Sequence, residues 1–151
     1  MVKVAVLLER TQGERRVAAT PETVKKLLAL GTAVMVEHDA GTGASIADDA
    51  FTAAGASVGN RAATVTGADI LLGVQGPDPV SLAGAAPGAW LVAALNPFGE
   101  RARVDAYAAA GLEALAMELM PRITRAQSMD CLLYTSPSPR DRTRSRMPSS
   151  A

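Results

Sequence analysis

The chain is poor in the side chains that build disulfides, metal centres and aromatic sites. Cys131 is its one cysteine, His38 is its one histidine, and aromatic residues make up 3% of the sequence. A lone cysteine cannot form an intrachain disulfide, and a zinc or iron site usually draws on several Cys and His ligands. The sequence therefore predicts no metal site. It also predicts no catalytic residue, because the spacing offers no partner to activate the thiol or the imidazole.

Long apolar runs are also missing. No run approaches the roughly 20 residues that span a bilayer, and the apolar residues 2–8 are too few for a signal peptide. Hydrophobic residues nevertheless make up 48% of the 151 residues, so the chain can bury a core of Ala, Val, Leu and Ile. We expect a globular cytoplasmic domain.

The chain has no overall excess of one charge, since basic and acidic residues number 15 each. The distribution is uneven: residues 131–151 hold four arginines against one aspartate, which leaves residues 1–130 mildly acidic. An acidic body argues against a nucleic-acid-binding domain. The segment 131–151 is rich in Pro, Ser and Arg and has little to bury, so it is predicted to be disordered. We expect a domain over residues 1–130, followed by a tail similar to a translation or assembly artefact.

Apolar runs and capped helices alternate along residues 1–130. Residues 2–8 are typical of a buried parallel strand. After a charged loop, Thr20 is placed as N-cap of a helix, Pro21 at its first position and Gly31 at its end. Further strands are predicted at residues 34–37, 69–74, 90–95 and 112–117, further helices at residues 48–54 and 101–110, and a weaker strand and helix before residue 67.

This alternation predicts an α/β fold with a mostly parallel sheet and helices on both faces, either Rossmann-like or flavodoxin-like. Ligands of such sheets bind beyond the carboxyl ends of the strands. The loop after the last predicted strand should lie at this edge. It contains Arg122, Gln127 and Asp130.

Arg122, Gln127 and Asp130 can together recognise a primary amide. A carboxamide oxygen accepts from a guanidinium or a glutamine amide, and a carboxamide NH2 donates to a carboxylate. The nicotinamide ring carries such a carboxamide. The three residues are therefore predicted to bind a cofactor and to have no catalytic role of their own.

A second glycine-rich candidate is weaker. Residues 41–46, GTGASI, begin like a dinucleotide fingerprint, but Ile46 stands where the third glycine belongs. A glycine-rich turn after the second strand is the preferred interpretation, which leaves no cradle for a pyrophosphate. In the loop around Glu14 and Arg16, an arginine could orient an anionic ligand or could simply be solvated.

The segment MELMPRITRAQSMD, residues 117–130, resembles the signature loop of the NAD(H)-binding alpha subunit of proton-translocating NAD(P) transhydrogenases. The stretches ERRVAATPETVKKLLALG, VEHDAGTGASI and ADILLGVQGP also resemble the amino-terminal region of that family, which is shared with the alanine dehydrogenases. The resemblance implies that Arg122, Gln127 and Asp130 contact the nicotinamide end of NAD(H). A serine that also contacts the nucleotide in the family has no match here, because Leu133 stands near its place.

The resemblance also separates the two relatives. Alanine dehydrogenases have a substrate-binding lysine where this chain has Gln75 and a catalytic histidine in the region of Asn96. Transhydrogenase is therefore preferred over an alanine-dehydrogenase-like oxidoreductase. A non-catalytic interaction module, using the strand ends or the basic tail, remains a third alternative.

The family implies a larger assembly than this chain. Its members continue into a second, Rossmann-type domain, so the chain is expected to be an inactive fragment with weak or no NAD(H) binding. The complete enzyme would transfer hydride to NADP+ held by a partner domain, while membrane subunits move protons. The resemblance further implies a homodimer at the cytoplasmic side of the inner membrane, and no nucleic-acid partner.

Overall fold

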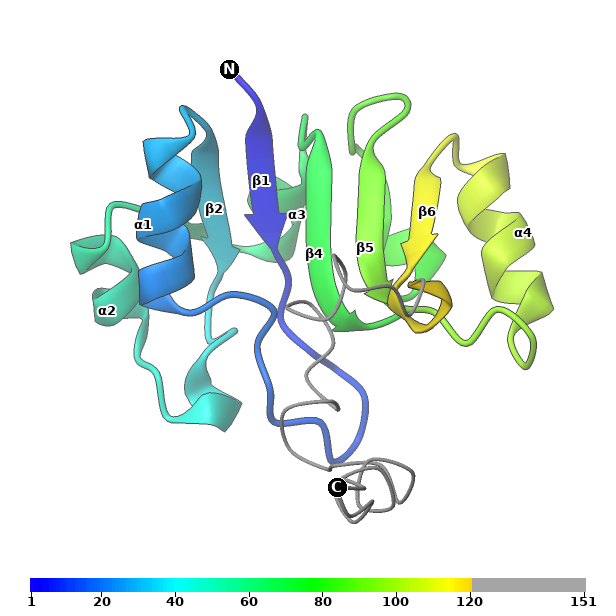
Figure 1. Ribbon diagram of the computed structural model, residues 1–151, viewed down its shortest axis with the longest axis horizontal. Helices are drawn as coiled ribbons and strands as arrows, with labels where there is room; N and C mark the ends of the chain where they lie inside the picture. The colour runs from blue at the N-terminus through cyan, green and yellow to red at the C-terminus, as the bar shows by residue number, and fades with distance from the viewer. Residues whose placement is uncertain (121–151) are drawn as a thin grey trace, which may run out of the picture. The chain divides into compact units, whose positions relative to one another are not determined.

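A parallel sheet forms the centre of residues 1–120, the segment of the chain that the computed structural model describes (Figure 1). Within this segment, all neighbouring strands pair in parallel in the order β3-β2-β1-β4-β5-β6. This is the strand order of the dinucleotide-binding Rossmann fold, so the predicted fold class is confirmed. The strands are β1 (Lys3–Val6), β2 (Ala33–Glu37), β3 (Ser57–Gly59), β4 (Ile70–Gln75), β5 (Trp90–Ala94) and β6 (Glu113–Ala116).

Helices lie on both faces of the sheet, as predicted (Figure 1). Helices α1 (Pro21–Ala29) and α2 (Asp48–Ala53) pack on one face, over β1 and β2. The opposite face is covered by α3 (Arg61–Val65), α4 (Arg101–Ala109) and the 3-10 turn η2 (Pro79–Leu82). Two further 3-10 turns are η1 (Thr42–Ala44) and η3 (Met117–Leu119).

Side-chain caps determine where the helices begin. The Thr20 hydroxyl accepts from the Thr23 N–H at 3.3 Å, and Pro21 occupies the first turn, as the sequence predicts. Asn60 acts in the same way for α3, because its Oδ1 accepts from the Ala63 N–H at 2.9 Å. This cap supports a five-residue helix that is too short to have a clear apolar period.

The core consists of two apolar layers, one on each face of the sheet, because successive side chains of a strand point to opposite faces. In β1, Val4 and Val6 pack with Val24 of α1 and Phe51 of α2. Ala5, by contrast, belongs to the second layer. That layer also contains Val65 of α3, Leu82 of η2 and Tyr107 of α4.

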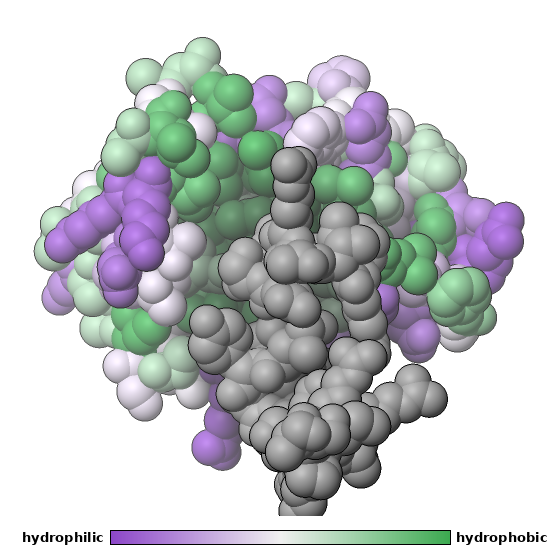
Figure 2. Space-filling view, in the orientation of Figure 1, coloured by the Kyte–Doolittle hydropathy of each residue, from purple (hydrophilic) through white to green (hydrophobic). Residues whose placement is uncertain are grey.

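Within residues 1–120, the face that carries α1 and α2 is covered only over β1 and β2. Over the other strands, Trp90 is 49% exposed, Leu115 is also exposed, and Leu72 and Val92 are half-buried. Figure 2 shows hydrophobic residues gathered over the middle of this face, with hydrophilic ones toward its sides. The sheet thus presents an apolar surface on β4, β5 and β6.

Residues 1–118 form one compact unit. No helix within residues 1–120 combines the length and apolar character needed to cross a membrane. The segment 131–151 lies outside the described residues, so the domain boundary at residue 130 and the disorder of the tail remain predictions.

Candidate functional site

A cavity of about 470 Å³ opens where the chain switches direction in the sheet. After β1 the chain adds strands on one side, and it then crosses back to place β4 on the other side of β1. Crevices at such switch points, beyond the carboxyl ends of the strands, are the usual ligand sites of open α/β sheets. The lining comes from the ends of β1 and β4 and from neighbouring helices: Leu7, Leu8, Glu9, Arg10, Thr11, Arg61, Gly73, Gln75, Gly76, Pro77, Asp78, Pro79, Ser81 and Arg103.

Glu9 joins the two strands that border this switch-point cavity. Its carboxylate accepts from the backbone N–H groups of Val74, at 2.5 Å, and Gln75, at 3.2 Å. The pairing of β4 with β5 shifts between Leu72 and Gln75, so strand pairing is irregular in this segment. The carboxylate therefore supplies acceptors at an irregular strand end and fixes Gln75 at the cavity.

Glu37 is the buried anion of the site. Its side chain is 3% exposed and accepts from the Leu8 N–H at 2.8 Å. Arg10 approaches it at 3.1 Å, and Arg61 Nε lies 3.1 Å from its other oxygen. Arg61 also donates to the Leu8 carbonyl, and burial lowers the pKa of its guanidinium. Glu37 thus connects the end of β2 to the chain that leaves β1 and to the start of α3.

The loop that follows β1 forms a neutralised pair next to Gln75. Arg16 donates to Glu14 from Nε at 2.8 Å and from Nη2 at 2.6 Å, and Gln75 Nε2 donates to the same carboxylate at 3.1 Å. These bonds, the Arg16 contact foremost, hold the pKa of Glu14 far below its usual range. The sequence left open whether this loop is solvated. In the structure its arginine is paired to a carboxylate and its polar groups face Gln75.

Helix α4 closes the cavity from the side of η2. Arg103 Nη1 donates to the Gly76 carbonyl at 2.9 Å, and the buried Tyr107 hydroxyl donates to the Pro77 carbonyl. Both bonds satisfy carbonyl groups of the turn that leaves β4. This turn is therefore held by side chains of a helix that lies some thirty residues further along the chain.

The buried phenol of Tyr107 should make the domain sensitive to alkali. Burial raises the pKa of Tyr107 to about 12, from 10 in the unfolded chain. The phenol thus ionises first in the unfolded state, so stability present below pH 10 should be lost between about pH 10 and 12, on the order of 2 kcal/mol. Urea unfolding across this range should show the loss in the native chain. It should be much smaller in Tyr107→Phe, and an equal loss in both proteins would contradict the assignment.

The glycine-rich turn serves packing. A Cβ at Gly41 would lie 2.5 Å from the Ile46 carbonyl oxygen, and a Cβ at Gly43 would lie 2.9 Å from the Arg15 carbonyl oxygen. These glycines belong to η1 and its entry, directly after β2. The structure therefore supports the turn over a dinucleotide fingerprint. The connection from β1 to α1, residues 7–20, carries a charged loop in the place where the Rossmann fold has its phosphate-binding glycines.

The residues predicted to bind the cofactor lie outside the segment that the structure describes. This holds for Arg122, Gln127 and Asp130, so their contact with nicotinamide remains a prediction. Of the two positions that separate the relatives, Gln75 lines the cavity. Asn96 follows β5 with a left-handed backbone, at φ 47°, and its side chain packs against Gly99.

Sequence reasoning missed the charged residues that shape the cavity. Glu9, Glu37, Arg61 and Arg103 each contact backbone or charge from a distant segment. A signal was present for two of them, because Glu9 follows an apolar strand almost directly and Glu37 ends one. Acidic residues at the carboxyl end of a buried strand lie at the ligand-binding edge.

A known family matches most of the chain. The sequence model described as "Alanine dehydrogenase/PNT, N-terminal domain" matches residues 5–137. The chain belongs to this family. The resemblance expected from the sequence is therefore confirmed at the level of the family.

Transhydrogenase subunits match over most of the chain. The first polypeptide of the NAD(P) transhydrogenase alpha subunit of Rhodospirillum rubrum is 48% identical over 139 residues, which cover 87% of this chain and 36% of that protein. NAD(P) transhydrogenase subunit alpha of Haemophilus influenzae is 40% identical over 129 residues, covering 85% and 25%. The chain thus spans about a third or less of the length of these relatives.

Solved structures give the same ranking of the two relatives. A transhydrogenase from Sinorhizobium meliloti superposes with a TM-score of 0.82 and 45% identity, covering 86% of this chain and 39% of that one. An L-alanine dehydrogenase has a TM-score of 0.69 and 26% identity, covering 76% and 32%. Alanine dehydrogenases are therefore the more distant relatives, as expected from Gln75 and Asn96.

Proposed function

We propose that this chain is the amino-terminal portion of an NAD(H)-binding subunit whose complete enzyme transfers hydride between NADH and NADP+. The observation that carries the proposal is the 48% identity to a transhydrogenase alpha subunit over 87% of the chain. Because the chain spans about a third of that relative, turnover is assigned to the longer protein. The fragment alone should be inactive and should bind NAD(H) weakly or not at all.

The described residues fit one end of the nucleotide better than the other. The switch-point cavity has a volume typical of small-ligand sites, and Gln75 and Ser81 offer it neutral polar groups. The β1–α1 connection lacks the glycine turn that would hold a pyrophosphate. We therefore assign this cavity region to the nicotinamide half, together with Arg122, Gln127 and Asp130 of the following loop.

Gln75 favours this assignment over amino-acid oxidation. A 2-oxo acid substrate needs a cation to bind its carboxylate, but Gln75 is neutral and Arg16 is already bound to Glu14 on two nitrogens. An uncharged carboxamide needs no such cation.

The residues of this chain position a ring and supply no acid, base or nucleophile. The nicotinamide cofactor supplies the hydride chemistry when it is bound. Glu9 and Arg103 fix the backbone around the cavity. Arg122, Gln127 and Asp130 would orient the carboxamide, and thus the ring, toward the partner domain.

The complete enzyme would include partners that this chain does not contain. We assign NADP(H) to a partner domain and proton movement to membrane subunits, with this subunit peripheral to the inner membrane on its cytoplasmic side. A homodimer of the NAD(H)-binding subunit completes the proposed assembly.

An assay of the complete gene product with its partner subunits tests the function. We expect reduction of NADP+ by NADH and no NADH oxidation with pyruvate and ammonium. NADH oxidation that depends on pyruvate and ammonium would instead identify an alanine dehydrogenase. Activity with neither pair of substrates would overturn the assignment as an enzyme of hydride transfer and favour a non-catalytic module.

A further inference from the structure

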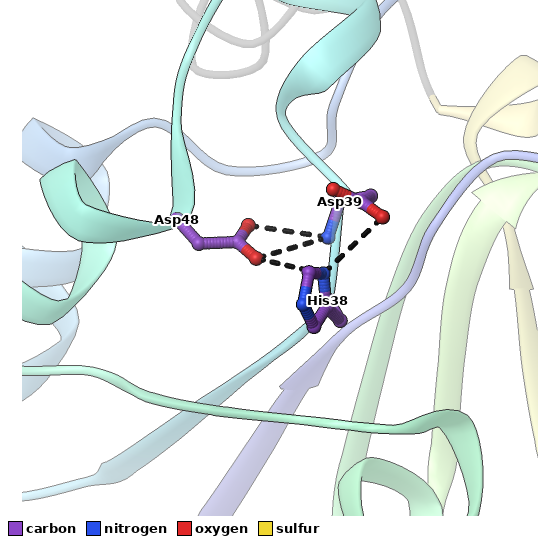
Figure 3. A group of neighbouring side chains, drawn as sticks. All are labelled: His38, Asp39 and Asp48. Atoms are coloured by element: carbon purple, nitrogen blue, oxygen red, sulfur yellow. Dashed lines mark hydrogen bonds and ion pairs between the residues drawn. The ribbon is translucent and has the colours of Figure 1, made fainter.

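We propose that His38, Asp39 and Asp48 bind a divalent transition-metal ion at the carboxyl end of β2. The spacing in the sequence indicates no partner for His38, but the fold brings the start of α2 back to it (Figure 3). His38 Nδ1 lies 2.9 Å from Asp48 Oδ2 and 3.2 Å from Asp39 Oδ2. One ligand atom from each residue falls within 4.8 Å of the other two.

The imidazole nitrogen faces two anionic oxygens, which it cannot satisfy equally as a neutral donor. One N–H supplies a single proton, whereas both carboxylates approach the same Nδ1. Two carboxylates close together also repel each other. A dication placed between the three groups would accept lone pairs from all of them and neutralise the pair of carboxylates.

Little movement is needed to admit an ion. Ligand atoms that surround a tetrahedral zinc at roughly 2.0–2.2 Å stand about 3.3–3.6 Å apart. The observed separations from Nδ1 are a few tenths of an ångström shorter, and the His38 side chain is 68% exposed, so it can adjust.

Asp48 is the anchored member of the three. Its side chain is 21% exposed, and both of its oxygens lie 3.2 Å from the Asp39 N–H that donates to them. Carboxylate ligands of metal sites are commonly oriented by such outer hydrogen bonds.

The donor set indicates the class of ion. One imidazole and two carboxylates suit zinc and the neighbouring late first-row metals, with water at the remaining position, whereas magnesium and calcium prefer all-oxygen sites. This site lies apart from the switch-point cavity, since none of its three residues lines that cavity. We therefore assign it no role in hydride transfer.

Titration of the full chain with zinc chloride tests the proposal. Cys131→Ser is used as the background, so that no thiol can bind the metal. The chain has one histidine, so every imidazole proton resonance belongs to His38. We expect saturable 1:1 binding by calorimetry, a shift of the His38 resonances, and no response to magnesium. Absence of saturation up to about 1 mM zinc, or binding that leaves the His38 resonances unmoved, would overturn the proposal.

Variants separate the site from general surface charge. In the same background, His38→Gln and Asp48→Asn should each weaken zinc binding by at least ~10-fold, since loss of even an outer partner of a metal costs about that much. Asp105→Asn is the matched control, because its exposed carboxylate pairs only with Arg101 in the described segment of the chain. The control should bind zinc like the parent. Equal weakening in all three variants, with unchanged circular dichroism, would reduce the effect to nonspecific attraction and refute the site.

Discussion

Glu37→Gln should lower the free energy of unfolding by about 3–5 kcal/mol, the usual cost of removing one partner from a buried ion pair. Glutamine keeps the shape of the side chain and can still accept from the Leu8 N–H. It removes the negative charge that faces Arg61, whose side chain is itself largely buried. A guanidinium without its counter-ion in a desolvated place is the source of the loss. Urea unfolding at neutral pH measures it.

Glu22→Gln provides the matched control. Glu22 forms an exposed pair with Lys26 one turn along α1, at 3.3 Å, and such pairs contribute about 0.5 kcal/mol or less. The double variant Glu37→Gln/Arg61→Gln should recover some of the loss, because the uncompensated charge is gone. A loss below ~1 kcal/mol in the single variant would mean that the ion pair is better solvated than its burial indicates.

Arg122→Ala should slow hydride transfer from NADH by about 100-fold in the complete enzyme, because a misplacement of roughly 1 Å at the reacting ring costs that much. The expectation rests on the proposed role of the loop in orienting the nicotinamide carboxamide. Single-turnover measurement with saturating NADH separates the rate of transfer from binding. Gln127→Leu and Asp130→Asn should reduce the same rate.

Arg125→Ala is the control for this prediction. Arg125 lies in the same loop and has the same charge, but it is not one of the three residues predicted to recognise the amide. Its replacement should leave the single-turnover rate close to that of the parent enzyme. If both arginine variants lost the same activity, the effect would come from the charge of the loop and the amide-reading role of Arg122 would be refuted.

Much of the fold could be predicted because its signals are local. The strand at residues 2–8 and the helix that begins at Pro21 are marked by their own residues, and Gly31 ends that helix with a positive φ of 80°. Helix α3 was harder to predict, since five residues carry no period and its main mark is the Asn60 cap.

The cavity could be predicted only in part, because its contacts join distant residues. The sequence drew attention to Glu14 and to Gln75 separately. Their hydrogen bond spans 61 positions and depends on β4 pairing beside β1. Glu9 and Glu37 look like solvated charges in the sequence. Their burial follows from strand order, which local patterns do not encode.

The half-exposed indole on β5 gives the chain an optical reporter of its own. Trp90 is the only tryptophan of the sequence, and it stands on the area of the sheet that α1 and α2 leave open. Any polypeptide that settles on that surface must displace water from the ring, which would move its fluorescence emission to shorter wavelengths. Assembly of this domain into a larger protein can therefore be followed without a label.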